Sequence, residues 1–201
     1  MTQLPKALLT KYPFLQAARF FDVEASGLHQ GSFPIQFGWC DLNLQAEQFL
    51  VKPHSTWTVE LTDPESTKIH GIERQETIDH GLTLKMACLK LNNQFSECHI
   101  ISDAPSFDEY WTNRLFVTAN MKREFSICSI ESVLRQYNSL EILDQLFLPQ
   151  HESVQEAILK QYPHTHKADE DGLSAAACFR GLIDHEWGKE LLNYQNAKHS
   201  K

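Results

Sequence analysis

The sequence predicts an α/β protein in which a mixed β-sheet is flanked by helices. Two apolar segments, 20–23 and 34–41, precede a third at 47–52. The polar residues Asn43–Gln45 form a short turn between the last two segments, which is typical of an antiparallel hairpin. Further along, short apolar strands alternate with helical segments, and this alternation favours parallel strand pairing. Together the two patterns predict a mixed sheet.

The remaining elements are expected in chain order. Residues 53–68 are polar and contain Pro, which predicts a loop, and a short helix is expected after the segment 70–72. A buried strand at 98–102 leads into a helix that begins at Pro105, because Pro suits the first helical turn. The other predicted elements are helices at 84–91, 130–137, 152–161, 171–184 and 185–196 and a strand at 124–128.

Two carboxylates stand one residue apart at the end of the first strand. Residues i and i+2 of a strand point to the same face, so Asp22 and Glu24 project together just before a turn at Ser26 and Gly27. Acids that face one another repel unless a cation lies between them, and Mg²⁺ takes carboxylate and water oxygens. The simpler alternative is a strand end with two solvated acids.

Two further acidic sites lie later in the chain. His166 precedes a helix whose first turns carry Asp171, although acids there also complement the helix dipole. Asp103 and Asp108 flank the start of the helix that follows the strand 98–102. Asp103 or Ser102 suits the cap of that helix, which would leave Asp108 as a solvated acid.

These residues occur in a fixed order, which reads Asp22-x-Glu24, Phe107-Asp108 and His166-x-Ala168-x-x-Asp171. The set resembles the three exonuclease motifs of the DEDD superfamily, in its histidine-containing DEDDh or DnaQ-like branch. That branch includes proofreading subunits of DNA polymerases, ribonuclease T and oligoribonuclease. The segment Ile69–Ile72 resembles the His-Gly-Ile segment that these enzymes carry between the first and second motifs. The resemblance runs from about residue 19 to about residue 183, and it implies a ribonuclease H-like fold.

The resemblance also implies an activity, namely metal-dependent 3′→5′ hydrolysis of single-stranded DNA or RNA ends, or of short oligonucleotides. Four carboxylates would hold two Mg²⁺ ions, or Mn²⁺, and a histidine would deprotonate the attacking water. A pair of ions about 3.5–4 Å apart stabilises both oxygens of an in-line displacement, and a neutral imidazole can accept a proton near pH 7. The implied catalytic residues are Asp22, Glu24, Asp108, His166 and Asp171.

Substrate contacts are expected beside these acids. Ser26 and Gly27 allow the backbone to approach a terminal nucleotide closely. Aromatic side chains can stack on bases without reading their sequence. The candidates for stacking are Phe33, His70, Trp57 and Trp111, each of which could equally belong to the core.

The chain departs from the family pattern at the second motif, where the family often has His-Asn-Ala-x-Phe-Asp. Asp103 stands near the place of the amide, and one extra residue precedes Phe107. Asp103 is therefore an alternative to Asp108 as a metal ligand. In the third motif Asp169 and Glu170 are spare acids, and the spacing from His166 selects Asp171.

Length and composition fit one domain in a reducing compartment. The chain has 201 residues, and residues 1–197 are expected to form one exonuclease-like domain with a disordered tail at 198–201. No apolar run is long enough to cross a membrane. The five cysteines are scattered and odd in number, which predicts free thiols and a cytoplasmic location. His164 and His166 could bind zinc with Cys98, although this spacing matches no standard site.

The formal net charge of −8 argues against a broad electrostatic grip on duplex nucleic acid. It suits a short substrate or a few nucleotides of single strand. Two alternatives stay open, a catalytically silent nucleic-acid-binding module on the same fold and a small-nucleotide phosphodiesterase. Because family members are often dimers, a homodimer is one expected assembly, although no segment identifies an interface.

Overall fold

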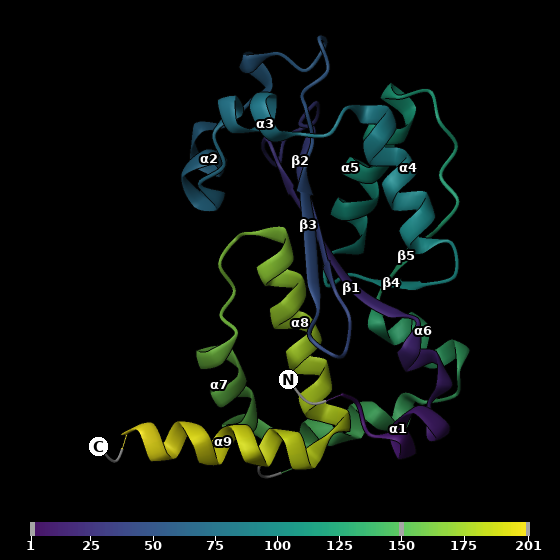
Figure 1. Ribbon diagram of the computed structural model, residues 1–201, viewed down its shortest axis with the longest axis vertical. Helices are drawn as coiled ribbons and strands as arrows, with labels where there is room; N and C mark the ends of the chain where they lie inside the picture. The colour runs from purple at the N-terminus through teal and green to yellow at the C-terminus, as the bar shows by residue number, and fades with distance from the viewer. Residues whose placement is uncertain (1–2, 149–150, 200–201) are drawn as a thin grey trace.

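The computed structural model describes residues 3–148 and 151–199 and contains a mixed sheet with helices on both faces (Figure 1). The strands are β1 (Ala18–Ala25), β2 (Pro34–Cys40), β3 (Ala46–Leu50), β4 (His99–Ile101) and β5 (Ile127–Cys128). Their order is β3-β2-β1-β4-β5, antiparallel among the first three and parallel from β1 to β4 to β5. The predicted mixed α/β sheet is confirmed.

Helices connect and cover these strands. The α-helices are α1 (Lys6–Lys11), α2 (Pro64–His70), α3 (Arg74–His80), α4 (Leu84–Phe95), α5 (Pro105–Thr118), α6 (Ile130–Gln136), α7 (His151–Gln161), α8 (Ala168–Ile183) and α9 (His185–His199). Short 3-10 helices lie at η1 (Pro13–Gln16), η2 (Val59–Leu61) and η3 (Leu140–Phe147).

Several segments differ from the prediction. The expected loop 53–68 contains η2 and most of α2, which begins where Pro64 takes the first helical position and Asp63 accepts a hydrogen bond from the backbone N–H of Glu65. Helix α1 and the 3-10 helices η1 and η3 were not predicted. Helix α9 runs to His199, two residues into the expected tail, and residues 200–201 lie outside the described part of the chain.

The two faces of the sheet carry different cores. One face packs against α4 and α5 through large aromatic side chains, which include Phe21, Phe37 and Phe95. The opposite face is covered by α8, with Ala176 and Ala177 buried against the side of the sheet that carries Phe20. In Figure 1 helix α8 lies on the other side of the strands from α4 and α5. The sheet is thus the middle layer of three.

Helix α8 approaches the sheet closely because two glycines leave room for it. A methyl group on Gly38 of β2 would lie 2.1 Å from the backbone of Ala168, the first residue of α8. A methyl group on Gly172 would lie 2.8 Å from the carbonyl oxygen of Phe20 in β1. Gly38 is paired with Asp22 across the β1–β2 ladder. The first turns of α8 are therefore held beside the acid of the first motif.

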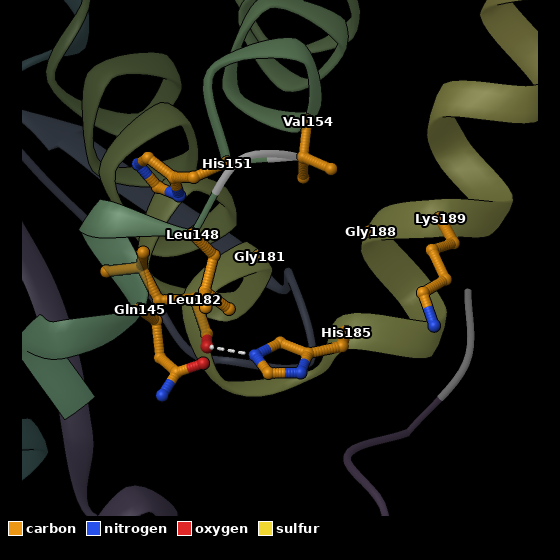
Figure 2. Close-up of a pocket in the computed structure, with 9 residues that line it drawn as sticks. All are labelled: Gln145, Leu148, His151, Val154, Gly181, Leu182, His185, Gly188 and Lys189. Atoms are coloured by element: carbon orange, nitrogen blue, oxygen red, sulfur yellow. Dashed lines mark hydrogen bonds between the residues drawn. The ribbon is translucent and has the colours of Figure 1, made fainter. Parts of the chain in front are cut away.

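A small cavity lies at the other end of α8, where it meets η3, α7 and α9 (Figure 2). His185 and Gly188 line it, and an imidazole nitrogen of His185, Nε2, lies 3.1 Å from the carbonyl oxygen of Leu182. Among the described residues, none of the predicted site acids contributes to its wall.

Two predictions from composition can be compared with the structure. All five cysteines are free, with Cys40 and Cys88 buried and the other three half-buried. Within residues 3–148 and 151–199, no helix has the length and apolar character needed to cross a membrane.

Candidate active site

Asp22 and Glu24 lie on the same face of β1, as the strand period predicts. Their neighbours Phe21, Val23 and Ala25 are buried in the aromatic core on the opposite face. The two acids point instead to the side that α8 covers, where both are only partly exposed. They are therefore not a pair of solvated acids at a strand end, which was the simpler alternative.

Asp171 joins these acids from α8. One carboxylate oxygen from each of Asp22, Glu24 and Asp171 lies within 4.8 Å of the others. Buried Gln36 fixes the start of the helix, because its Oε1 accepts a hydrogen bond of 2.9 Å from the backbone N–H of Ala168. Gln36 is paired with Glu24 across the ladder. No local pattern in the sequence marks Gln36, since its role depends on strand pairing.

The electrostatics of this cluster favour a bound cation. Burial raises the pKa of Asp22 to about 7, and the negative charges of Asp171 and Asp103 add to the effect. Burial, with Asp22 and Asp171 nearby, raises the pKa of Glu24 to about 8. Burial also raises the pKa of Asp171. A divalent cation would remove this repulsion, and an all-carboxylate donor set fits a hard ion such as Mg²⁺.

The second motif places Asp108 at the edge of the cluster. Asp108 is only 2% exposed on α5, and the hydroxyl of Ser102 donates a hydrogen bond of 2.5 Å to its Oδ2. Burial, followed by the charge of Asp22, raises its pKa to about 8. The alternative of a solvated Asp108 is therefore wrong. Ala104 occupies the cap position of α5 and no side chain caps it, so Asp103 and Ser102 do not have the predicted cap role.

Asp103 is exposed at the end of β4, and its charge raises the pKa of both Asp22 and Asp108. It therefore lies close enough to the other acids to remain an alternative ligand to Asp108. Asp108 is not among the three acids whose oxygens cluster within 4.8 Å.

His166 lies in the loop that leads into α8. Its backbone has a φ of 58°, in the left-handed region that non-glycine residues adopt rarely and often at functional sites. The side chain is exposed, and its ring lies edge-on to that of His164 with 4.5 Å between centroids. Of the spare acids, Glu170 accepts a hydrogen bond of 2.6 Å from the hydroxyl of Thr165, whereas Asp171 faces the β1 acids.

A cavity of about 260 Å³ adjoins the acids. Glu24 and His166 line one part of its wall, and the exposed side chains of Leu28 and Ile69 line another. The remaining lining residues are Val23, Ala25, Gly27, Ser66, His70 and Trp111. The cavity thus combines a carboxylate, an imidazole and apolar surface, which is the composition of a small-ligand site.

His70, one of the lining residues, carries a buried polar atom. The residue is 4% exposed, and its Nδ1 accepts a hydrogen bond of 2.9 Å from the backbone N–H of Ile72. Gly71 makes this turn possible with a φ of 69°. The ring proton of the neutral imidazole is therefore on Nε2, which has no hydrogen-bond partner within the described residues. Burial, with His166 nearby, lowers the pKa of His70 and so favours its neutral form.

The other predicted substrate contacts fall into two groups, residues that are buried and residues that line the cavity. Ser26 is buried, where its hydroxyl donates to the carbonyl of Leu61 and accepts from the N–H of Phe33. Phe33 is 2% exposed and stacks on buried Trp57 with 5.1 Å between centroids. Neither ring can stack on a base, so that expectation is wrong for both. Gly27, His70 and Trp111 do line the cavity.

The strand order and the acids that β1 and α8 bring together define a class, the ribonuclease H-like fold with a carboxylate centre. No family model and no curated protein matches the chain. Among solved structures, the zinc-ion-bound complex of E. coli exonuclease I with single-stranded DNA has a TM-score of 0.59 at 20% identity, over 88% of this chain and 42% of that one.

Two further structures agree. The E. coli exonuclease I complex with a dT13 oligonucleotide has a TM-score of 0.60 at 19% identity, over 88% of this chain and 42% of that one. Exonuclease I from Methylocaldum szegediense has a TM-score of 0.57 at 20% identity, over 90% and 42%. The chain spans less than half the length of these proteins. The likeness confirms the ribonuclease H-like fold that the resemblance to DEDDh exonucleases implied.

Proposed function

We propose that the chain is a metal-dependent 3′→5′ exonuclease that hydrolyses phosphodiester bonds at single-stranded DNA or RNA ends. The observation that carries the proposal is the meeting of Asp22, Glu24 and Asp171 within 4.8 Å beside a cavity lined by Glu24 and His166. An all-carboxylate cluster next to a nucleotide-sized cavity and an exposed imidazole has the parts that metal-assisted hydrolysis needs.

The metal ligands would come from separate segments. Asp22, Glu24 and Asp171 would hold one ion, and Asp22 with Asp108, or with Asp103 in its place, would hold a second. Mg²⁺ is the expected ion and Mn²⁺ a substitute, since both prefer carboxylate oxygens. When bound, the ions would acidify water and neutralise charge on the phosphate.

The other residues would act on the substrate and on the proton. His166, whose imidazole is exposed, would accept the proton of the attacking water. His70 would donate its free Nε2–H to an oxygen of the terminal nucleotide, because this buried donor has no partner among the described residues. Leu28 and Ile69 would contact the base, and Gly27 would let the backbone approach it.

The comparisons support this function through the proteins they name. One of the similar exonuclease I structures holds single-stranded DNA and a zinc ion, and another holds a dT13 oligonucleotide. The net charge of −8 suits a substrate gripped at its end. The five free thiols suit a cytoplasmic location. A homodimer remains a prediction from the family resemblance.

The volume of the cavity also supports a related candidate function. About 260 Å³ holds little more than one nucleotide, so the same centre could act on dinucleotides as a small-nucleotide phosphodiesterase. The two functions differ in the length of substrate they accept.

The deciding experiment is hydrolysis of 5′-labelled single-stranded DNA and RNA of two to twenty or so nucleotides, with Mg²⁺, Mn²⁺ or EDTA. Asp22→Asn removes an acid of the cluster, and Asp144→Asn is a control on an exposed acid of η3. A ladder that shortens from the 3′ end, needs metal and disappears only in Asp22→Asn is the expected result.

Two other results would contradict the exonuclease proposal. Cleavage restricted to dinucleotides would establish the phosphodiesterase instead. No cleavage at any length, in a folded chain that binds Mg²⁺, would favour a catalytically silent nucleic-acid-binding module.

A further inference from the structure

A second group of metal-ligating side chains lies at the start of α8. His164 and His166 are two residues apart in the preceding loop, and Asp171 is in the first turns of the helix. One ligand atom from each of the three residues lies within 4.8 Å of the others. The sequence left Cys98 open as a third zinc ligand, although its spacing matches no standard site. Among the described residues Asp171 takes that place, whereas Cys98 precedes β4, at the opposite end of that strand from Asp103.

The spacing of His164 and Asp171 is close to the ligand spacing of a tetrahedral metal site. Bonds of about 2.1 Å from a tetrahedral ion would place its ligand atoms about 3.4 Å apart. Nδ1 of His164 already lies 3.1 Å from Oδ1 of Asp171. The rings of His164 and His166 lie edge-on with 4.5 Å between centroids, so small side-chain rotations can bring all three ligands to one ion.

The loop is held in the conformation that brings these ligands together. The backbone N–H of Thr165 donates a hydrogen bond of 2.7 Å to Oδ1 of Asp171, and its hydroxyl donates one of 2.6 Å to Glu170. Thr165 therefore ties the loop to the first turn of α8 with one histidine on each side of it. His164 is 53% exposed, which leaves the site open to ions from solution and leaves room for a water as a fourth ligand.

We propose that His164, His166 and Asp171 bind a single zinc ion. This ion is distinct from the Mg²⁺ that Asp22 and Glu24 would hold, although both sites include Asp171. Imidazole nitrogens select borderline ions such as Zn²⁺, whereas an all-carboxylate set selects hard ions. His164 lies outside the acids and the histidine on which the resemblance to the DEDDh branch rests. The site is therefore not one that the resemblance implies.

Zinc at this site would inhibit hydrolysis, and this consequence rests on the proposed function. The two clusters share Asp171, so zinc would compete with the catalytic ion for that carboxylate. Zinc would also occupy the imidazole of His166, which then could not accept a proton from water.

The first test measures zinc binding directly, without an activity assay. The full chain would be titrated with Zn²⁺ against a chromophoric chelator in excess Mg²⁺, beside His164→Ala and the control His80→Ala, which changes an exposed histidine on α3. Wild type and the control are expected to bind one ion equally well. His164→Ala is expected to bind it more than about tenfold more weakly, because even outer-shell partners are worth about 10–100-fold in metal affinity.

Two outcomes of this test would overturn the proposal. Equal zinc affinity in wild type and His164→Ala would remove His164 from the site. A loss of zinc binding in Asp22→Asn as large as that in His164→Ala would place the ion in the carboxylate centre. Circular dichroism would verify that each variant is folded, which is expected for His164→Ala because its side chain is half exposed.

Nitrogen NMR of the imidazoles supplies a second, independent readout. Zinc is expected to shift the ring nitrogens of His164 and His166 and to leave those of His80 unchanged. Absence of a shift at both residues would overturn the proposal. In the hydrolysis assay, zinc inhibition should be relieved in His164→Ala relative to that variant's own rate with Mg²⁺. A chain with no hydrolytic activity would refute the proposed function, while the binding and NMR results would still decide the zinc site.

Discussion

The two faces of strands β1 and β2 are built from opposite kinds of side chain. On the face toward α4 and α5, Phe21 of β1 is paired with Trp39 of β2, and both belong to the aromatic core. On the face toward α8, the next cross-strand pair of the same ladder is Asp22 and Gly38. Bulky rings fill the first space, whereas the absence of a side chain at Gly38 lets a helix backbone reach the sheet on the second.

This contrast shows how one sheet separates stability from chemistry. Large buried rings supply apolar area and keep the strands in register. The other face has no side chain at Gly38, so α8 lies close to the sheet and Asp171 lies beside the acids of β1. Substitutions on the aromatic face should therefore change stability, and substitutions on the α8 face should change the rate.

After the loss of activity expected for Asp22→Asn, the largest effect on rate is expected at His166, in the loop that leads into α8. His166→Ala should lower the rate of hydrolysis about 10²–10⁴-fold, in the range for loss of a general base. The measurement is the pH–rate profile under single-turnover conditions, in which the limb caused by imidazole ionisation should disappear. An unchanged profile would exclude His166 as the base.

The aromatic face should respond to Phe95→Ala with a loss of stability. Phe95 is 1% exposed and packs edge-on against Phe21, Trp39 and Phe125. Truncation of such a buried ring costs about 3–5 kcal/mol in free energy of unfolding. Urea unfolding measures this cost, and the rate per folded molecule should stay near that of wild type. A large fall in rate without a loss of stability would break the proposed separation of the two faces.

Gly38→Ala tests the close approach of α8. The added methyl would meet the backbone of Ala168, so the first turn of the helix must move away from Asp22. Misplacement of a catalytic group by about 1 Å can cost about 10²-fold in rate. Single-turnover kinetics, with circular dichroism as a check of folding, measures the effect. A wild-type rate in the folded variant would show that the helix position is not critical.

Asp103→Asn and Asp108→Asn compare the two candidate ligands of the second motif. Asp108 is buried beside Ser102, whereas Asp103 is exposed. If Asp108 holds an ion, directly or through water, its variant should lose about 10–100-fold in Mg²⁺ affinity and the Asp103 variant less. Mg²⁺-dependent rates give both affinities. The reverse order would assign the ligand to Asp103.

The last effect expected is on stability as a function of pH. The pKa of Asp22 is about 7 in the folded chain, against an ordinary value of 3.8, and that of Glu24 is about 8, against 4.5. The folded state therefore binds more protons than the unfolded state between about pH 4 and pH 8. The contribution of these acids to stability is full at low pH and falls as the pH rises through that window.

Thermal unfolding in EDTA at pH 5.5 and pH 8.5 would measure this dependence. Mg²⁺ should raise the unfolding temperature more at the higher pH, where the acids must ionise. Asp22→Asn should flatten the dependence in EDTA. A wild-type chain that is equally stable at both pH values would contradict the repulsion described for this cluster.

The sequence alone determined the features that depend on short-range geometry. The period of a strand places Asp22 and Glu24 on one face, whatever the rest of the chain does. The spacing from His166 selects Asp171 among three adjacent acids, and the turn at Asn43–Gln45 forms because Asp41 accepts hydrogen bonds from the backbone N–H groups of Asn43 and Gln45. These features involve residues only a few positions apart.

Only the tertiary structure decided which distant residues meet and which are buried. The sequence left open whether Phe33 and Trp57 stack on bases or belong to the core, and the structure places their stacked rings in the core. Gln36 acquires its role from strand pairing and from the approach of a helix more than a hundred residues away. His164 contacts Asp171 rather than Cys98, because the loop folds back on α8. Contacts of this kind depend on how elements pack together, and no local period or spacing records that.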